Sequence, residues 1–288
     1  MLVKFAVKAR GISHIENDSP CQDAVTAQLS RNKTVGIACV ADGHGSAKHF
    51  RSDKGSVMAV QVAEKALFDF CGTIATEKAA FFNRKPGNEE KQKNDILTKL
   101  KQLEGNIIYQ WRNGVLRDFT KNPFTEAETK FCKDNNITLD DDPANMMFVY
   151  GTTLLAGLVS DSFWFVLQIG DGQCVVLENR ENISIPVVED ERLAFGRTTS
   201  LCDNDAIKNF RENYGFSKIL GLTLATDGIS DSFEPEKYLQ FNKELYEKFM
   251  NFPVRAETEL QDFLPEISER GSRDDVSIAG IFRIREQQ

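Results

Sequence analysis

Strand-like and helical segments fall into separate groups along this chain, and this grouping limits the folds that it can adopt. Near the N-terminus, Val3, Phe5 and Val7 alternate with Lys4 and Lys8, a two-residue period that is typical of half-buried strands. The other strand-like segments are residues 25–29, 35–41, 148–158, 163–169, 173–177, 219–226 and 276–284. Apolar residues recur at helical spacing over residues 46–70, 95–119, 124–131, 235–249 and 255–268.

The order of these segments predicts the fold class. Strands come first, then helices, then strands again, and last two helices and a final strand. This grouping favours an α+β domain with antiparallel sheets over a parallel βαβ arrangement. The 288 residues contain no internal repeat, low-complexity tract or linker. We therefore predict a single domain over residues 1–288, with helices covering the sheets.

The composition excludes several classes of protein. A chain with 41% hydrophobic and 27% charged residues has the balance of an ordinary globular protein, not of a disordered or collagen-like one. The net charge of −8 argues against a nucleic-acid partner bound by a basic surface. The six cysteines include no closely spaced pair, which predicts reduced thiols, no zinc site and a cytoplasmic location.

One apolar stretch, from Gly151 to Gly170, imitates a membrane span because Asp161 is its only charged residue. The polar residues 160–162 divide it into two runs of strand length, whereas a spanning helix needs about 20 mainly apolar residues. The N-terminal segment is too short and too charged for the apolar core of a signal peptide. We predict a β-hairpin at this stretch and no membrane partner.

Aspartates occur repeatedly at the ends of the strand-like runs. Three runs are followed directly by Asp-Gly, at Asp42-Gly43, Asp171-Gly172 and Asp227-Gly228. Asp-Gly is a favoured hairpin turn, and for the pair at 171–172, with strands on both sides, a turn alone explains it. Asp42 differs because it leads into a helix. Asp23 and Asp274-Asp275 each precede a strand directly.

Strand ends in a packed sheet lie along a shared edge, so these acids can converge there. Unpaired carboxylates at close range repel one another and raise each other's pKa, and a divalent cation removes that repulsion. Oxygen ligands without a Cys–His pairing suit hard ions such as Mg²⁺ and Mn²⁺. The spacing of the acids therefore predicts a metal site with carboxylate ligands.

Six motifs in a fixed order extend this interpretation from about residue 10 to residue 284. They are Gly11-Ile12-Ser13-His14 with Pro20-Cys21-Gln22-Asp23, Ala41-Asp42-Gly43-His44-Gly45, Gly151-Thr152-Thr153, Gly170-Asp171-Gly172, Thr226-Asp227-Gly228-Ile229-Ser230-Asp231 and Arg273-Asp274-Asp275. Together they resemble the type 2C (PPM) metal-dependent serine/threonine protein phosphatases, most of all the bacterial branch. The resemblance implies a four-layer αββα sandwich, in which two antiparallel sheets pack face to face between helices.

The resemblance also implies an activity, the hydrolysis of phosphoserine and phosphothreonine in proteins by a water that divalent ions activate. Two ions, Mn²⁺ or Mg²⁺, would share Asp42 as a bridging ligand. Asp227 and Asp274 would complete the protein ligands of one ion, and the backbone carbonyl of Gly43 would bind the other. His44 matches the histidine that protonates the leaving seryl or threonyl oxygen, a role that suits an imidazole.

Other residues take secondary roles in the same comparison. Asp171 and Asp231, together with Asp227, match a third and weaker ion position. Gln22 stands where many members have a metal-binding glutamate, so the second ion would be held mostly through water. Asp23 would then orient metal-bound water instead of binding an ion directly.

The phosphate-binding arginine of the family has no clean counterpart in this chain. His14 lies nearest to it in the motif and is our candidate for the substrate phosphate. The other basic candidates, for which we expect an ordinary surface role, are Arg10, Lys48 and Arg51. His49 is expected to be structural, and Asp275 either supports Asp274 or caps the turn. Asp140 to Asp142 are expected to form a solvated acidic loop.

Two other functions stay open from the residues alone. One is a catalytically weak module that binds phosphoproteins through the same fold, which Gln22 and the missing arginine would favour. The other is a phosphatase that acts on a small phosphorylated metabolite. The physiological substrate depends on surface loops, in particular residues 178–218, where the family carries a variable flap. The sequence does not specify the partner kinase, the ion used in the cell or the oligomeric state.

Overall fold

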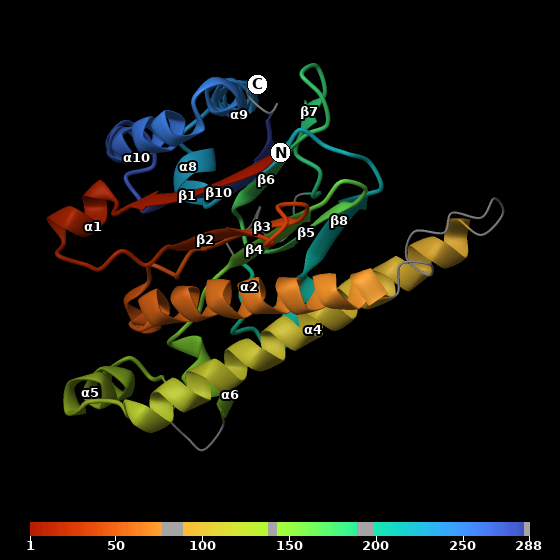
Figure 1. Cartoon of the computed structure of the whole chain (residues 1–288). Helices are drawn as coiled ribbons and strands as arrows, with labels where there is room; N and C mark the ends of the chain where they lie inside the picture. The colour runs from red at the N-terminus through yellow and green to blue at the C-terminus, as the bar shows by residue number, and fades with distance from the viewer. Residues whose placement is uncertain (77–88, 138–142, 189, 191–197, 285–288) are drawn as a thin grey trace.

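The computed structural model describes residues 1–76, 89–137, 143–188, 190 and 198–284, and it contains two five-stranded antiparallel sheets (Figure 1). The first sheet has the strand order β1-β10-β9-β6-β7, and the second has the order β2-β3-β4-β5-β8. The strands are β1 (Leu2–Ala9), β2 (Ala24–Leu29), β3 (Gly36–Ala41), β4 (Leu154–Val159), β5 (Trp164–Ile169), β6 (Gln173–Leu177), β7 (Ile183–Ser184), β8 (Arg211–Gly215), β9 (Gly221–Ala225) and β10 (Val276–Arg283).

The helices lie outside the sheets, and together they make a four-layer αββα sandwich (Figure 1). In the described ranges they are α1 (Ile12–Glu16), α2 (Ser52–Thr76), α4 (Glu89–Lys121), α5 (Glu126–Asp134), α6 (Pro143–Phe148), α7 (Ala206–Asn209), α8 (Asp227–Ser230), α9 (Pro235–Asn251) and α10 (Pro253–Arg270). A short 3₁₀ helix, Ala47–His49, precedes α2. The fold class predicted from the sequence is confirmed.

The hydrophobic core has three parts that follow these layers. Between the sheets, Leu2 and Ile281 of the first sheet pack with Val40, Leu155 and Val166 of the second. The long helices α2 and α4 cover the outer face of the second sheet, and α9 and α10 cover the outer face of the first. Each sheet is therefore buried on both faces, as expected when two sheets pack against each other beneath helices.

The periodic segments fold as predicted. In β1, Phe5 and Val7 are buried while Lys4 and Lys8 are exposed. The predicted helical stripe lies on α4 with every member buried, and consists of Ile96, Leu100, Leu103, Ile107 and Trp111. Within the described residues, α4 includes Glu89, earlier in the chain than the apolar stripe indicates, because its first turns carry charged residues and its buried residues start only at Ile96.

Two segments differ from the prediction. The strand predicted from residue 148 starts only at Leu154, because α6 occupies the chain up to Phe148. Thr152 and Thr153 make hydrogen bonds to the backbone of Asp42 instead of extending the strand. The polar segment Arg211–Gly215 was not expected to be a strand, yet it forms the edge strand β8 beside β5. An edge strand needs no continuous apolar face, so its polar sequence gave no strand signal.

The apolar stretch at residues 151–170 forms two paired strands. The predicted hairpin at residues 151–170 is formed by β4 and β5, which pair antiparallel. Over the described ranges, the model contains no helix with both the length and the apolar character needed to cross a membrane. All six cysteines are free thiols.

Candidate metal centre

Asp42 lies directly after β3, and the Gly151-Thr152-Thr153 motif holds its backbone from two sides. The N–H of Asp42 donates to Thr153 Oγ1 at 3.0 Å, and its carbonyl accepts from the Thr153 N–H at 2.8 Å and from Thr152 Oγ1 at 2.8 Å. These bonds take the place of the backbone hydrogen bonds that a longer β3 would make with β4. They explain why β4 begins only after the motif and fix the position of the Asp42 side chain.

Asp171 lies at a crossing between the two sheets. The preceding strand β5 belongs to the second sheet and the following strand β6 to the first, so the Asp-Gly pair is not a hairpin turn as the sequence suggested. Gly170 before it has a φ of +105°, which favours glycine. The crossing brings Asp171 to the ends of both sheets, where Thr198 Oγ1 donates to its Oδ2 at 2.5 Å.

Asp227 completes a group of three carboxylates. It is the first residue of α8 and follows β9 of the first sheet. One carboxylate oxygen from each of Asp42, Asp171 and Asp227 lies within 4.8 Å of the others. Strand ends from both sheets and one crossing therefore converge at a single point, as the spacing of the Asp-Gly pairs predicts.

The carboxylates of this centre oppose one another's ionisation. Burial, and then the charges of Asp23 and Asp227, raise the pKa of Asp42 well above its ordinary value. Burial, and then the charge of Asp171, raise the pKa of Asp227 to about 7. Burial and the charge of Asp171 also raise the pKa of Asp231. Concentrated negative charge of this kind favours a bound cation.

Asp23 is almost fully buried, with 1% of its surface exposed, and its charge raises the pKa of Asp42. The Oδ2 of Asp23 accepts from Thr226 Oγ1 at 2.9 Å. Its Oδ1 has no hydrogen bond of good geometry within the described part of the chain, although the hydroxyl of Ser277 lies close enough to lower the pKa of Asp23. The Oδ1 of Asp171 is buried and unpartnered in the same way. Burial raises the pKa of Asp23 strongly. Buried carboxylate oxygens without donors fit a site for a hard cation or its water.

Asp274 belongs to a neighbouring cluster with His14 and Asp275. His14 Nε2 lies 3.4 Å from Asp274 Oδ1, and His14 Nδ1 lies 3.0 Å from Asp275 Oδ2. Asp274 is not among the three carboxylates that lie within 4.8 Å of one another, although its charge raises the pKa of both Asp42 and Asp227. Asp231 also lies outside the three and is exposed.

Gln22 is tied to the loop that follows Asp42. Its Nε2 donates to Ser52 Oγ at 2.6 Å and to the carbonyl of His44 at 3.2 Å. Its backbone carbonyl accepts from the N–H of Gly43 at 3.2 Å. A side chain on Gly43 would meet the carbonyl oxygens of Ser52 and Gln22 at 2.7 and 2.8 Å, so this position needs glycine. Both amide hydrogens of Gln22 are thus used to hold the loop.

His44 packs against a second histidine at the rim of the centre. The rings of His44 and His49 are 4.8 Å apart and meet edge to face, and His49 Nδ1 contacts the carbonyl of Phe148 at 2.5 Å. Burial, and then His49, lower the pKa of His44 to about 4. With this pKa, the ring of His44 is neutral at pH 7.

The basic candidates for phosphate binding lie in different surroundings. Arg51 is buried, not a surface residue as expected: its guanidinium contacts Glu128 at 2.8 and 2.9 Å and Tyr150 Oη at 2.7 Å. Arg10 donates to the carbonyl of His14 at 2.9 Å, and Lys48 is exposed. The predicted acidic loop at residues 140–142 lies outside the described residues.

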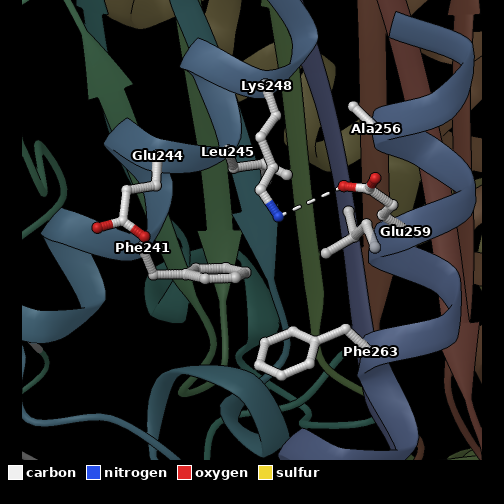
Figure 2. A pocket seen from close by; sticks show the side chains of 8 residues that line it. Phe241, Glu244, Leu245, Lys248, Ala256, Glu259 and Phe263 are labelled. Atoms are coloured by element: carbon white, nitrogen blue, oxygen red, sulfur yellow. Dashed lines mark ion pairs between the residues drawn. The ribbon is translucent and has the colours of Figure 1, made fainter. Parts of the chain in front are cut away.

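A pocket elsewhere on the molecule is separate from this centre. It lies between α9 and α10, where Phe241 and Phe263 form its apolar wall and Lys248 pairs with Glu259 across it at 3.6 Å (Figure 2). None of the predicted site residues lines it.

Several residues of the centre were missed in the sequence. Thr226 precedes Asp227 within a recognised motif, so its hydroxyl could have been suspected as a support for an acid. Ser52 and Thr198 had no such signal, because each reaches the centre from a different part of the chain and only the fold places them there.

Comparison with known proteins identifies the family over most of the chain. The family model described as protein phosphatase 2C matches residues 10–265. Among characterised proteins, serine/threonine-protein phosphatase 3 of Escherichia coli (strain K12) is 24% identical over 264 residues, which cover 89% of this chain and 85% of that protein.

Solved structures share the fold at low identity. A serine/threonine phosphatase of S. agalactiae has a TM-score of 0.56 at 12% identity, with 98% of this chain and 99% of that chain covered. The phosphatase PstP/Ppp of Mycobacterium tuberculosis has a TM-score of 0.54 at 18% identity, with 99% of each chain covered. The catalytic domain of PstP in complex with two manganese ions has a TM-score of 0.54 at 17% identity and the same coverage. With its motifs, its sandwich fold and a family match over most of its length, this chain belongs to the protein phosphatase 2C family of metal-dependent protein phosphatases.

Proposed function

We propose that this protein hydrolyses phosphoserine and phosphothreonine in other proteins at the centre formed by Asp42, Asp171 and Asp227. The observation that carries the proposal is the convergence of these three carboxylates within 4.8 Å. The E. coli relative, named a serine/threonine-protein phosphatase, supports the choice of substrate.

The donor set fits Mn²⁺ or Mg²⁺. It consists of carboxylate oxygens, two of them buried without a hydrogen-bond donor in the described ranges, on Asp23 and Asp171. We assign Asp42, Asp227 and Asp274 as ligands together with the Gly43 carbonyl, and Asp171 and Asp231 to a third, weaker position. Two divalent ions, when bound, supply a nucleophilic water at neutral pH and offset the charge of the phosphoryl group.

The residues of the chain perform the remaining tasks. Asp23 orients water through its free Oδ1, and Thr226 holds its other oxygen. His44 is neutral before substrate binds, because burial and His49 keep its pKa at about 4. The negative phosphate raises that pKa when it enters. His44 then takes up a proton from bulk water and delivers it to the leaving seryl or threonyl oxygen.

Two alternatives are not favoured by the comparisons. A binding module without turnover has no need for the converging carboxylates, and the named relatives are phosphatases. A phosphatase for a small metabolite would use the same centre and differ only in substrate.

The test measures phosphate release by chelator-stripped protein from phosphothreonine and phosphotyrosine peptides of one sequence and from a panel of sugar phosphates. We expect release that requires added Mn²⁺ or Mg²⁺ and has the highest kcat/KM on the phosphothreonine peptide. A higher kcat/KM on a sugar phosphate would assign the metabolite function. No release from any of them, by folded protein with metal, would refute the proposal.

A further inference from the structure

The loop Asp42-Gly43-His44 leaves one of its three backbone carbonyls without a donor. Thr152 and Thr153 donate to the carbonyl of Asp42, both at 2.8 Å. Two side-chain groups donate to the carbonyl of His44, at 3.0 and 3.2 Å. In the described ranges, no donor reaches the carbonyl of Gly43. Gly43 is buried, and a buried carbonyl without a donor is rare unless an ion or a water satisfies it.

The two donors to the carbonyl of His44 belong to Ser52 and Gln22, and the direction of each hydrogen bond is fixed. A carbonyl only accepts, so Ser52 Oγ gives its single hydrogen to His44, at 3.0 Å. Ser52 Oγ can then only accept from Gln22 Nε2, at 2.6 Å. The second hydrogen of the same amide goes to the His44 carbonyl, at 3.2 Å. This position therefore needs an amide nitrogen, because a carboxylate oxygen could donate neither bond.

The backbone of Gln22 is held as firmly as its side chain. Its N–H donates to Asp275 Oδ2 at 2.6 Å, and its carbonyl accepts from the N–H of Gly43 at 3.2 Å and from Ser56 Oγ at 2.5 Å. Ser52 and Ser56 are fully buried and lie four residues apart, on one face of α2 at its start. Gln22 thus joins three segments: the chain before β2, the loop after β3 and the first turns of α2.

We propose that Gln22 is a positioning residue of the metal centre: together with Ser52 it fixes the carbonyl of His44, and this holds the free carbonyl of Gly43 in place as a metal ligand. This proposal rests on the proposed function, in which the Gly43 carbonyl binds an ion. Groups that orient metal ligands from outside contribute to affinity, and loss of one typically weakens metal binding about 10–100-fold.

The first test needs neither metal nor substrate. Amide hydrogen exchange at Gly43 and His44 is followed by NMR in chelator-stripped protein, unmodified and with Gln22→Met or Ser52→Ala. Gln22→Met keeps the length of the side chain and removes both donors. We expect either substitution to speed exchange at these two positions roughly 5–30-fold, the factor that corresponds to one or two lost hydrogen bonds. Val40 in β3 should keep its exchange rate.

Thr26→Val is the matched control. Thr26 Oγ1 donates to Glu64 Oε2 at 2.5 Å, a side-chain bond that also joins the β2 segment to α2 but does not reach the loop. Thr26→Val should leave exchange at Gly43 and His44 unchanged. Unchanged exchange in Gln22→Met and Ser52→Ala would overturn the proposal, and so would exchange raised equally in Thr26→Val.

The second test measures Mn²⁺ affinity through the EPR signal of free Mn²⁺. We expect Gln22→Met and Ser52→Ala each to weaken binding at one site about 10–100-fold. The double variant should lose less than the product of the two single losses, because both residues act on one carbonyl. Losses that multiply fully would contradict a joint role. Weaker binding in Gln22→Met alone, with Ser52→Ala unchanged, would place Gln22 at the ion itself and overturn the positioning role.

The two proposals fail in different ways. Unmodified protein that binds no Mn²⁺ would refute the metal centre of the proposed function, while exchange at Gly43 and His44 would still report on the bonds of Gln22. Mn²⁺ binding that is equally tight in unmodified protein, Gln22→Met and Ser52→Ala would keep the centre and refute the role of Gln22. Ser52→Ala removes only one hydroxyl and covers the case in which Gln22→Met does not fold.

Discussion

The backbone of Gly151 lies directly against the ring of His44. A Cβ atom on Gly151 would be 2.6 Å from His44 Cδ2 and 2.7 Å from His49 Nδ1, distances too short for any contact. The absence of a side chain on Gly151 therefore sets the position of the histidine that we propose as proton donor.

Gly151→Ala is expected to displace His44 and reduce kcat. A misplacement of about 1 Å can cost on the order of 100-fold in rate, so we expect a loss of roughly 10–100-fold with Mn²⁺ affinity unchanged. Gly105→Ala on α4 is the matched control, because its Cβ meets nothing within 4 Å. The measurement is kcat at saturating metal. Full activity of Gly151→Ala would show that the position of His44 is unimportant.

Thr226→Val is expected to disturb Asp23. The hydroxyl of Thr226 donates to Asp23 at 2.9 Å and accepts from the N–H of Ser277 at 3.1 Å, so its loss leaves two buried groups without a partner. We expect a loss of about 1–3 kcal/mol in the free energy of unfolding and weaker Mn²⁺ binding, both measured on purified protein. Thr226→Ser keeps the hydroxyl and should behave like the unmodified protein. A loss in Thr226→Ser as large as that in Thr226→Val would contradict the assignment to the hydroxyl, because Thr226→Ser keeps it.

Arg51 is expected to stabilise the fold without binding phosphate. It is 4% exposed and pairs with Glu128, which is itself partly exposed. Removing one partner of a fully buried pair costs roughly 3–5 kcal/mol. The cost here is smaller because Glu128 is partly exposed, so Arg51→Ala should lower the urea midpoint by less than that amount implies. The KM of the remaining folded protein should stay unchanged. A raised KM at unchanged stability would instead give Arg51 the phosphate-binding role.

The cases of Arg51 and His14 show what the sequence could not reveal. Spacing of apolar residues and acids predicted the sheets, the main helices and the convergence of the Asp-Gly pairs, because these depend on local periodicity and on strand ends. It could not predict that Arg51 is buried against Glu128, or that His14 meets Asp274, since both contacts join distant segments. The edge strand β8 was missed for a related reason, because its partner β5 and not its own composition makes it a strand.

Glu104 is expected to make stability depend on pH. Burial raises its pKa from the ordinary value of 4.5 to about 7, although Lys101 lies 2.7 Å away. The folded protein thus binds this proton more tightly than the unfolded chain, so the contribution of Glu104 to stability is most favourable below pH 4.5 and declines as the pH rises to about 7. Above that pH, the buried charge of Glu104 lowers the free energy of unfolding by an amount that no longer changes with pH.

Glu104→Gln removes this titration while Lys101 keeps Glu212 at 3.3 Å. We expect Glu104→Gln to be more stable than the unmodified protein by roughly 1–3 kcal/mol at pH 8, with a much smaller difference at pH 4. Urea unfolding of both proteins at the two pH values provides the measurement. A stability difference that is the same at both would refute the assignment to Glu104.

The central claim is that the acidic centre around Asp42 binds the divalent ions that the reaction uses. The most direct measurement is Mn²⁺ binding followed by EPR, combined with phosphopeptide hydrolysis, on chelator-stripped unmodified protein and on Asp42→Asn. We predict that the unmodified protein binds Mn²⁺ and gains activity as its sites fill, whereas Asp42→Asn, folded by circular dichroism, loses both binding and hydrolysis. Equal Mn²⁺ binding by the two proteins, or hydrolysis that persists in Asp42→Asn, would contradict the account.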